Sequence, residues 1–232
     1  MPGFKIHITG STVLGIGYGV GAYALYNVPW ETCTVAGALC SVSGMLPDLD
    51  SDSGRPLQES LSFGAATVPM LLLERFRNLG WSPEQIVLAA AGIYLAIRFG
   101  FGAMLKKFTV HRGIFHSIPA AFLATLLAFL ICASGSLDMR YFKAGGVLLG
   151  FMSHLILDEI WSVDLKRFRL KSSFGTAIKF WSDNALATAT CYLLCALATL
   201  AVLQDPVWAN GSPEGQQLHQ MATEILDGAW RK

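Results

Sequence analysis

Residues 6–30 read IHITGSTVLGIGYGVGAYALYNVPW and contain no Asp, Glu, Lys or Arg. Residues 113–137 and 185–204 form two further runs that lack these four charged residue types. A helix that crosses the hydrocarbon core of a bilayer needs about 20 consecutive, mainly apolar residues. Each of the three runs is long enough for this, so the sequence predicts a protein embedded in a membrane.

The composition of the whole chain favours the same class. Of its 232 residues, 53% are hydrophobic and only 14% are charged, whereas soluble globular domains carry roughly 25% charged residues. A soluble chain of this length would lack the charged side chains needed to cover its surface. The formal net charge is +1, so bulk charge favours no class of partner. The five cysteines lie within apolar stretches and predict neither a disulfide framework nor a metal site.

The apolar segments indicate an all-α fold, a polytopic transmembrane helical bundle of about six or seven membrane segments. The third segment is short and contains Pro69, which makes it the weakest candidate. We predict one integral membrane domain over residues 1–205, followed by a polar tail over residues 206–232. The segments cover approximately residues 9–28, 32–47, 60–76, 84–105, 116–136, 141–160 and 184–204.

The distribution of Lys and Arg predicts an orientation. If all seven segments span, the N-terminus shares one side, here named side A, with the connections at residues 48–59, 106–115 and 161–183. These connections hold more Lys and Arg than the opposite side, side B. Short cytoplasmic loops carry such an excess, so side A is predicted to be cytoplasmic. The bases at side B and its edges are Arg75, Arg77, Arg140, Lys143, Arg231 and Lys232.

Histidine and aspartate residues from four separate segments fall on side A. A lone histidine near a helix end is usually a capping or interfacial residue, and an aspartate there is often a turn former. The joint pattern is harder to explain in this way, because ionisable groups at membrane depth are costly and tend to mark function. The residues are His7, Asp48, Asp50, His111, His116, His154 and Asp158.

These side chains form a candidate site for a divalent metal ion. His154 and Asp158 are four residues apart, so they share one helix face. Mixed imidazole and carboxylate ligands suit zinc, which we favour, and also manganese or iron. The set contains more polar residues than a closed structural site needs. Water bound at a spare coordination position of the metal would be activated for hydrolysis. In that case Asp50 or Asp158 is a candidate general base.

Two arginines are candidates for contact with an anionic substrate. Arg112 lies between the histidines at 111 and 116, where it either binds a phosphate oxygen or serves only as a cytoplasmic topology charge. Arg98 lies in the fourth apolar segment and either contacts a substrate or snorkels to the interface. Ser117 and Ser153 are either hydrogen-bond donors behind the ligands or capping and packing residues.

The motifs, in this order, resemble those of a family of bacterial inner-membrane metal-dependent hydrolases whose description also includes LexA binding. That family shows an N-terminal His, an LPD-x-D element, an HRG-x-x-HS element and a later H-x-x-x-D. Here these are His7, residues 46–50, residues 111–117, and His154 with Asp158. The resemblance covers about residues 1–185 and implies a location in the bacterial inner membrane.

The chain departs from the family pattern at one position. Many members continue the LPD-x-D element with a histidine, where this chain has Ser51. One metal position is then either lost or taken by Asp52. The ligand pattern is also similar to that of zinc-dependent phospholipases C and P1-type nucleases, a more distant likeness that implies an all-helical fold and phosphoester hydrolysis.

The leading prediction is a membrane-embedded, metal-dependent hydrolase of a phosphoester or lipid-like substrate. Residues 161–181 mix basic and aromatic side chains, which suits membrane lipids as partners and disfavours nucleic acid. One alternative is a metal-binding membrane scaffold that recruits a cytoplasmic regulator. A metal transporter is disfavoured, because the polar residues gather at side A while the side B halves of the helices look dry.

Overall fold

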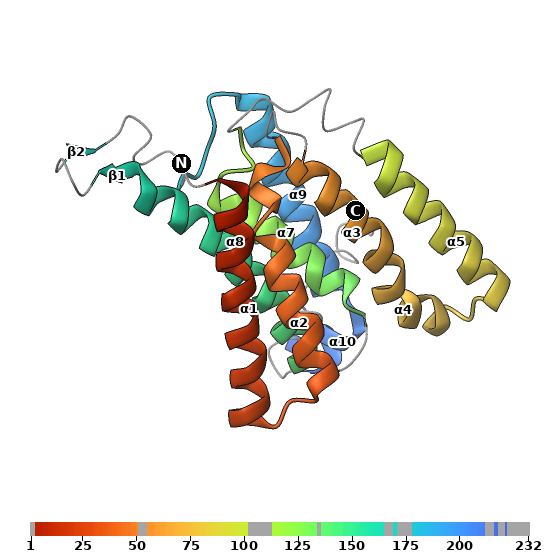
Figure 1. The fold of residues 1–232 in the computed structure, drawn as a ribbon. Coiled ribbons are helices and arrows are strands. Elements are labelled where there is room, and N and C mark those ends of the chain that lie inside the picture. The colour runs from red at the N-terminus through yellow and green to blue at the C-terminus, as the bar shows by residue number, and fades with distance from the viewer. Residues whose placement is uncertain are drawn as a thin grey trace.

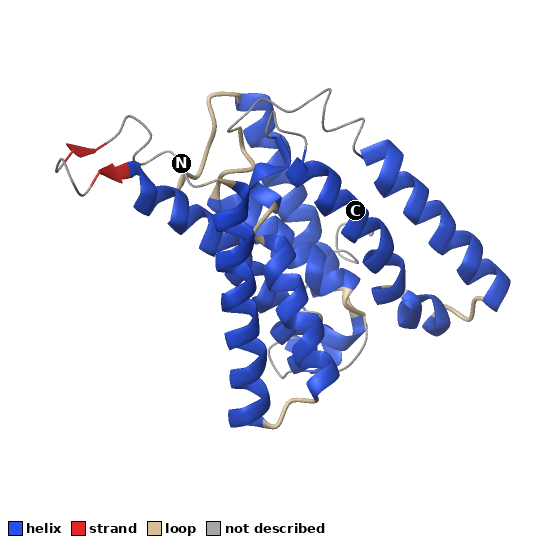
Figure 2. Ribbon diagram, viewed as in Figure 1, coloured by secondary structure: helices blue, strands red, loops and turns tan. Residues whose placement is uncertain are grey.

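The apolar stretches form helices, and the all-α fold class is confirmed. In the computed structural model the described residues are 3–50, 55–101, 113–133, 136–164, 169–170, 178–211, 216–217 and 221. Figure 2 shows helices nearly throughout, with one pair of two-residue antiparallel strands. The elements are α1 (Phe4–Tyr26), α2 (Trp30–Ser43), η1 (Leu46–Asp50), α3 (Arg55–Leu71), α4 (Leu73–Asn78), α5 (Pro83–Leu95), η2 (Ala96–Phe101), α7 (Ile118–Ile131), α8 (Leu137–Ser162), β1 (Val163–Asp164), β2 (Arg169–Leu170), α9 (Ala185–Leu203) and α10 (Pro206–Gly211).

Three helices among the described residues are long and apolar enough to cross a membrane: α1, α8 and α9. They correspond to the first, sixth and seventh predicted segments. The other apolar segments form shorter helices, and the third is divided between α3 and α4. The fourth continues from α5 into η2, a π-helical stretch that contains Arg98. The count of six or seven spanning segments therefore stays a prediction.

The core of the bundle is a hairpin of α1 and α2 packed against α8. Figure 1 shows these helices with α7 and α9 behind them, while α3, α4 and α5 form a layer at one side. Helices α7 and α9 pack against each other, and α7 also packs against α8. The N-terminal ends of α1 and α7 and the C-terminal ends of α2 and α8 meet at one end of the bundle, so residues distant in sequence converge there.

Glycines bring α8 into backbone contact with α2. A Cβ atom on Gly146 would lie only 2.7 Å from the carbonyl oxygen of Ala36, and one on Gly150 would overlap the carbonyl oxygen of Cys40. Lipid tails provide little hydrophobic drive for helix association, so close packing at small residues contributes much of the stability. The two glycines thus set the distance between α2 and α8 near the convergent end.

The opposite end of the bundle contains buried charge, which the sequence analysis did not predict. The carboxylate of Asp205 lies 2.6 Å from Nη2 of Arg75 and 3.1 Å from Nη1 of Arg140. The same guanidinium groups donate to the carbonyl oxygens of Leu130 and Ala133, at the C-terminal end of α7. The expectation that the side B halves are dry is therefore wrong, because buried charged groups lie there, and the guanidinium groups also bind carbonyls that the end of α7 leaves without helical partners.

Replacing Gly150 by alanine tests the close approach of α8 and α2. Gly150→Ala is expected to lower the free energy of unfolding by about 3 kcal/mol, because the new methyl group overlaps a backbone carbonyl that cannot rotate away. Gly17→Ala is the matched control, since a Cβ atom there meets nothing within 4 Å. Thermal unfolding in detergent measures both variants, and equal shifts would contradict this account of the packing.

The ion pairs of Asp205 predict a pH-dependent contribution to stability. Burial raises the pKa of Asp205, but the hydrogen bonds from Arg75 and the Val207 amide and the charge of Arg140 outweigh it, so the pKa lies below its ordinary value of 3.8. Asp205→Asn is expected to cost about 3 kcal/mol at neutral pH, because it leaves a buried charge without its partner.

A carboxylate with a lowered folded-state pKa stabilises the fold above its ordinary pKa and loses this contribution as the pH falls through the folded-state value. The stability difference between wild type and Asp205→Asn should thus be constant near neutral pH and shrink below about pH 3.8. Denaturant titrations at several pH values measure it. A difference that does not change with pH would exclude the ion pairs as its cause.

Candidate metal centre

Five of the predicted ligands converge at the end of the bundle where α1 begins. His7 lies near the start of α1, Asp48 in the 3₁₀ turn η1 after α2, and His116 just before α7. His154 and Asp158 lie one turn apart on α8. Four segments that are far apart in the sequence therefore supply side chains to one place.

Short polar contacts fix the segments that carry these ligands. The hydroxyl of Ser11, one turn after His7, donates to the carbonyl oxygen of Ser41 at 2.7 Å and so joins α1 to α2. Ser117 is the N-cap of α7, and its hydroxyl accepts from the amide of Ala120 at 3.3 Å. This cap starts the helix directly after His116. Ser117 thus has the capping role that the sequence left open.

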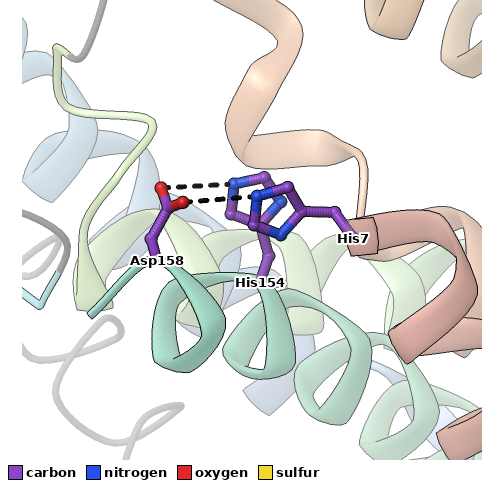
Figure 3. A group of neighbouring side chains, drawn as sticks. All are labelled: His7, His154 and Asp158. Atoms are coloured by element: carbon purple, nitrogen blue, oxygen red, sulfur yellow. Dashed lines mark ion pairs between the residues drawn. The ribbon is translucent and has the colours of Figure 1, made fainter. Parts of the chain in front are cut away.

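The first ligand group contains His7, His154 and Asp158, all of them buried. Figure 3 shows the two imidazole rings stacked, with the carboxylate of Asp158 facing them. The ring centroids are 3.7 Å apart at an interplanar angle of 13°. Nε2 of His7 lies 3.2 Å from Oδ1 of Asp158, and Nε2 of His154 lies 3.7 Å from Oδ2. Both nitrogens therefore point toward the same carboxylate.

The second group contains Asp48, His116 and His154, so His154 belongs to both groups. Oδ1 of Asp48 lies 3.5 Å from Nε2 of His116 and 3.6 Å from Nε2 of His154. Nε2 of His116 also lies 3.8 Å from Oδ2 of Asp158. The two groups are thus neighbours that share one imidazole and form a continuous set of three histidines and two carboxylates.

A backbone carbonyl orients the shared histidine. Nδ1 of His154 lies 2.7 Å from the carbonyl oxygen of Gly44. Since a carbonyl can only accept, Nδ1 carries the proton, and Nε2 is left with its lone pair toward the carboxylates, which is the form of a metal-binding histidine. A Cβ atom on Gly44 would overlap the side chain of Ser11, so glycine is required where this carbonyl approaches.

The site fits a divalent metal ion. Nε2 of His154 and both carboxylate oxygens of Asp158 are buried and form no hydrogen bond within the described part of the chain. Such groups are costly to bury without partners. Ligand atoms about 2.0–2.1 Å from a tetrahedral zinc ion lie about 3.3 Å from one another, close to the separations of 3.2 to 3.8 Å found here.

Asp48 is the ligand nearest to solvent. Its side chain is 20% exposed, against 2% for that of His116. Burial raises the pKa of Asp48, but the adjacent imidazoles of His116, His154 and His7 outweigh it and lower the pKa below its ordinary value. Asp48 is therefore ionised at neutral pH, and with Asp158 it offers two negative charges to match a divalent cation.

The remaining candidates are placed as follows. Asp50 lies at the end of η1, where only its backbone is described. Four other candidates lie outside the described residues: Ser51, Asp52, His111 and Arg112. Ser153 donates to the carbonyl oxygen of Gly150 at 2.7 Å, which is a packing role. The sequence analysis missed the contact between the carbonyl of Gly44 and His154. The only signal for it in the sequence is that a glycine stands shortly before the LPDLD element.

Comparison with protein-family models matches the description YdjM inner membrane protein over residues 7–210. The chain belongs to this family. The matched range includes all five convergent residues, and the match confirms the predicted inner-membrane family. Searches of curated proteins and of solved structures found no match. The likeness to phospholipases C and P1-type nucleases stays a prediction.

Metal content provides the direct test of the site. His154→Ala and Asp48→Ala are each expected to lower the metal bound per chain by at least about tenfold, because each removes a ligand. His219, the one histidine outside the motifs, supplies the control His219→Ala, which should bind as wild type does. Elemental analysis of detergent-purified protein gives the result. Wild-type protein that neither retains nor takes up zinc, manganese or iron would refute the assignment.

Proposed function

We propose that this inner membrane protein is a metal-dependent hydrolase that acts on a phosphoester, with zinc as the preferred ion and manganese or iron as alternatives. The observation that carries the proposal is the buried set of His7, His154 and Asp158, joined through His154 to His116 and Asp48. Three imidazoles and two carboxylates supply more ligands than a four-coordinate structural zinc site needs.

The chemistry follows from the ligands and their charge. When bound, a divalent ion supplies Lewis acidity and lowers the pKa of a water molecule toward neutrality. Two aspartates balance the charge of one such ion, so an anionic phosphate group is not repelled from the site. His7, His116, His154 and Asp158 are almost fully buried and would hold the ion, whereas Asp48 is the most exposed of the five ligands.

Burial favours a metal-binding role over a base role for Asp158. Asp158 lies between three imidazole nitrogens with both oxygens buried, so we assign it as a ligand rather than a base. Asp50, two residues after Asp48 in the LPDLD element, is then the candidate general base. Arg112 is proposed to bind a phosphate oxygen. Both roles rest on the sequence motifs.

A lipid-like substrate suits the depth of the site. His7 lies in the first turn of α1, a candidate membrane span, so the ligands lie where a spanning helix meets the interface. Phospholipid headgroups, with their phosphates, occupy this level next to the hydrocarbon core. We place the site at the cytoplasmic face, because the connections on side A carry the excess of Lys and Arg.

A second function is favoured by one observation. The low exposure of four of the five ligands is typical of a closed, structural metal site. In this alternative the metal would stabilise a membrane scaffold that recruits a cytoplasmic regulator. Removing the metal would then unfold the protein, and no substrate would be turned over.

Hydrolysis assays separate the two functions. Purified protein loaded with zinc or manganese is expected to cleave at least one of three probes: p-nitrophenyl phosphate, bis(p-nitrophenyl) phosphate and micellar phosphatidic acid. Asp48→Asn is expected to lower kcat/KM by about 100-fold or more, because it removes a ligand charge at the entrance. His219→Ala should retain wild-type activity.

The accompanying measurement is the melting temperature with and without chelator. A metal-loaded wild type that cleaves none of the probes, and that loses its fold when the metal is removed, would overturn the hydrolase proposal and support the scaffold. Residual hydrolysis that is equal in wild type and Asp48→Asn would show a contaminating activity.

A further inference from the structure

A second cluster of charged side chains lies at the end of the bundle opposite the metal centre. It consists of Arg75 on α4, Arg140 and Lys143 on α8, and Asp205 between α9 and α10, and is called the basic cluster below. Figure 1 shows α4 and α10 at the end away from the N-terminus. The cluster shares no residue with the metal centre and has no role in the proposed hydrolysis.

The basic cluster is buried and partly satisfied. Arg140 is 3% exposed, Lys143 5% and Asp205 4%. Asp205 pairs with both arginines, whose remaining printed contacts are to the carbonyl oxygens of Leu130 and Ala133. Nε of Arg75 and Nε of Arg140 are buried and form no hydrogen bond to any described residue. Donor capacity therefore remains on both guanidinium groups.

The cluster has more positive than negative charge. Two guanidinium groups share the one carboxylate of Asp205, and Lys143 lies about one turn after Arg140 on α8. Glu74, the acidic residue of α4, does not add to the charge of the cluster, because its Oε1 lies 2.9 Å from Nη1 of Arg77. Buried charge that is not balanced costs several kcal/mol per ion, so an added anion would stabilise the fold.

The surroundings indicate where that anion would come from. Trp208 on α10 donates to the hydroxyl of Tyr141 at 2.7 Å and packs against the core formed by α7, α8 and α9. Trp and Tyr gather at the level of lipid headgroups. The side chain of Arg75 is 35% exposed, so one guanidinium of the cluster reaches the surface at this level.

We propose that the basic cluster binds a phosphate group, supplied by the headgroup of an anionic phospholipid, with Arg75 as the exposed contact. Guanidinium groups bind phosphate through charge-assisted, often bidentate hydrogen bonds. Basic pockets between membrane helices bind lipid headgroups in this way. A lipid bound there would tie α4, α8 and α9 together at the membrane face opposite the metal centre.

Lipid binding to the full chain tests the proposal. Protein in phosphatidylcholine nanodiscs is compared with protein in nanodiscs that also contain phosphatidylglycerol, by melting temperature and by retained lipid in native mass spectrometry. Phosphatidylglycerol is expected to raise the melting temperature of wild type and to remain bound. Arg75→Gln should weaken its apparent affinity by about tenfold or more, and Arg75→Lys should lose less because it keeps the charge.

Arg77→Gln is the matched control, because Arg77 lies on the same short helix, is exposed and pairs with Glu74. It should bind phosphatidylglycerol as wild type does. Melting temperatures in inorganic phosphate and in chloride distinguish the source of the bound phosphate group. A higher melting temperature in inorganic phosphate shows that any phosphate group suffices, and one raised by the lipid alone shows a headgroup site. The proposal is overturned if neither protects wild type, or if Arg75→Gln and Arg77→Gln lose binding equally.

Discussion

The buried carboxylate of Asp158 is the constraint on which the convergent end of the bundle depends. Its oxygens lie among the Nε2 atoms of His7, His116 and His154 at 3.2 to 3.8 Å, and the carboxylate is hidden from solvent. Both carboxylate oxygens and Nε2 of His154 are buried without a hydrogen bond within the described part of the chain, which is costly. A divalent cation could be held by His7, His154 and Asp158, or by Asp48, His116 and His154.

Close packing of backbones makes this convergence possible. Gly146 and Gly150 let α8 approach the carbonyls of α2, and Gly44 brings a carbonyl within 2.7 Å of Nδ1 of His154. A larger residue at any of these positions would push α8 away from the segment that carries Asp48. Because these glycines have no side chain, the helices can approach closely, and this approach sets the positions of the ligands. Such packing at small residues is typical of membrane helices.

The sequence predicted the parts of this structure that local pattern determines. The uncharged runs at residues 6–30, 113–137 and 185–204 correspond to α1, α7 and α9, and the i, i+4 spacing of His154 and Asp158 put both on one face of α8. The number of spanning segments did not follow, because α2 and α7 are shorter than their apolar runs suggested. The carbonyl of Gly44 was missed as well, since a backbone group leaves no mark in residue type. The charged cluster at the other end was not predicted either. Its members come from separate segments, and each alone resembles an ordinary charge near a helix end: Arg75, Arg140 and Asp205.

The two ends of the bundle have complementary charge. One end brings two carboxylates together with three imidazoles, whereas at the other end the carboxylate of Asp205 pairs with two guanidinium groups. Both clusters lie at helix termini: His7 and His116 are near helix starts, and Arg75 and Arg140 contact the carbonyls where α7 ends. A chain with so few charges keeps several of them at these two levels, because only there can buried ions find backbone groups and ligands to balance them.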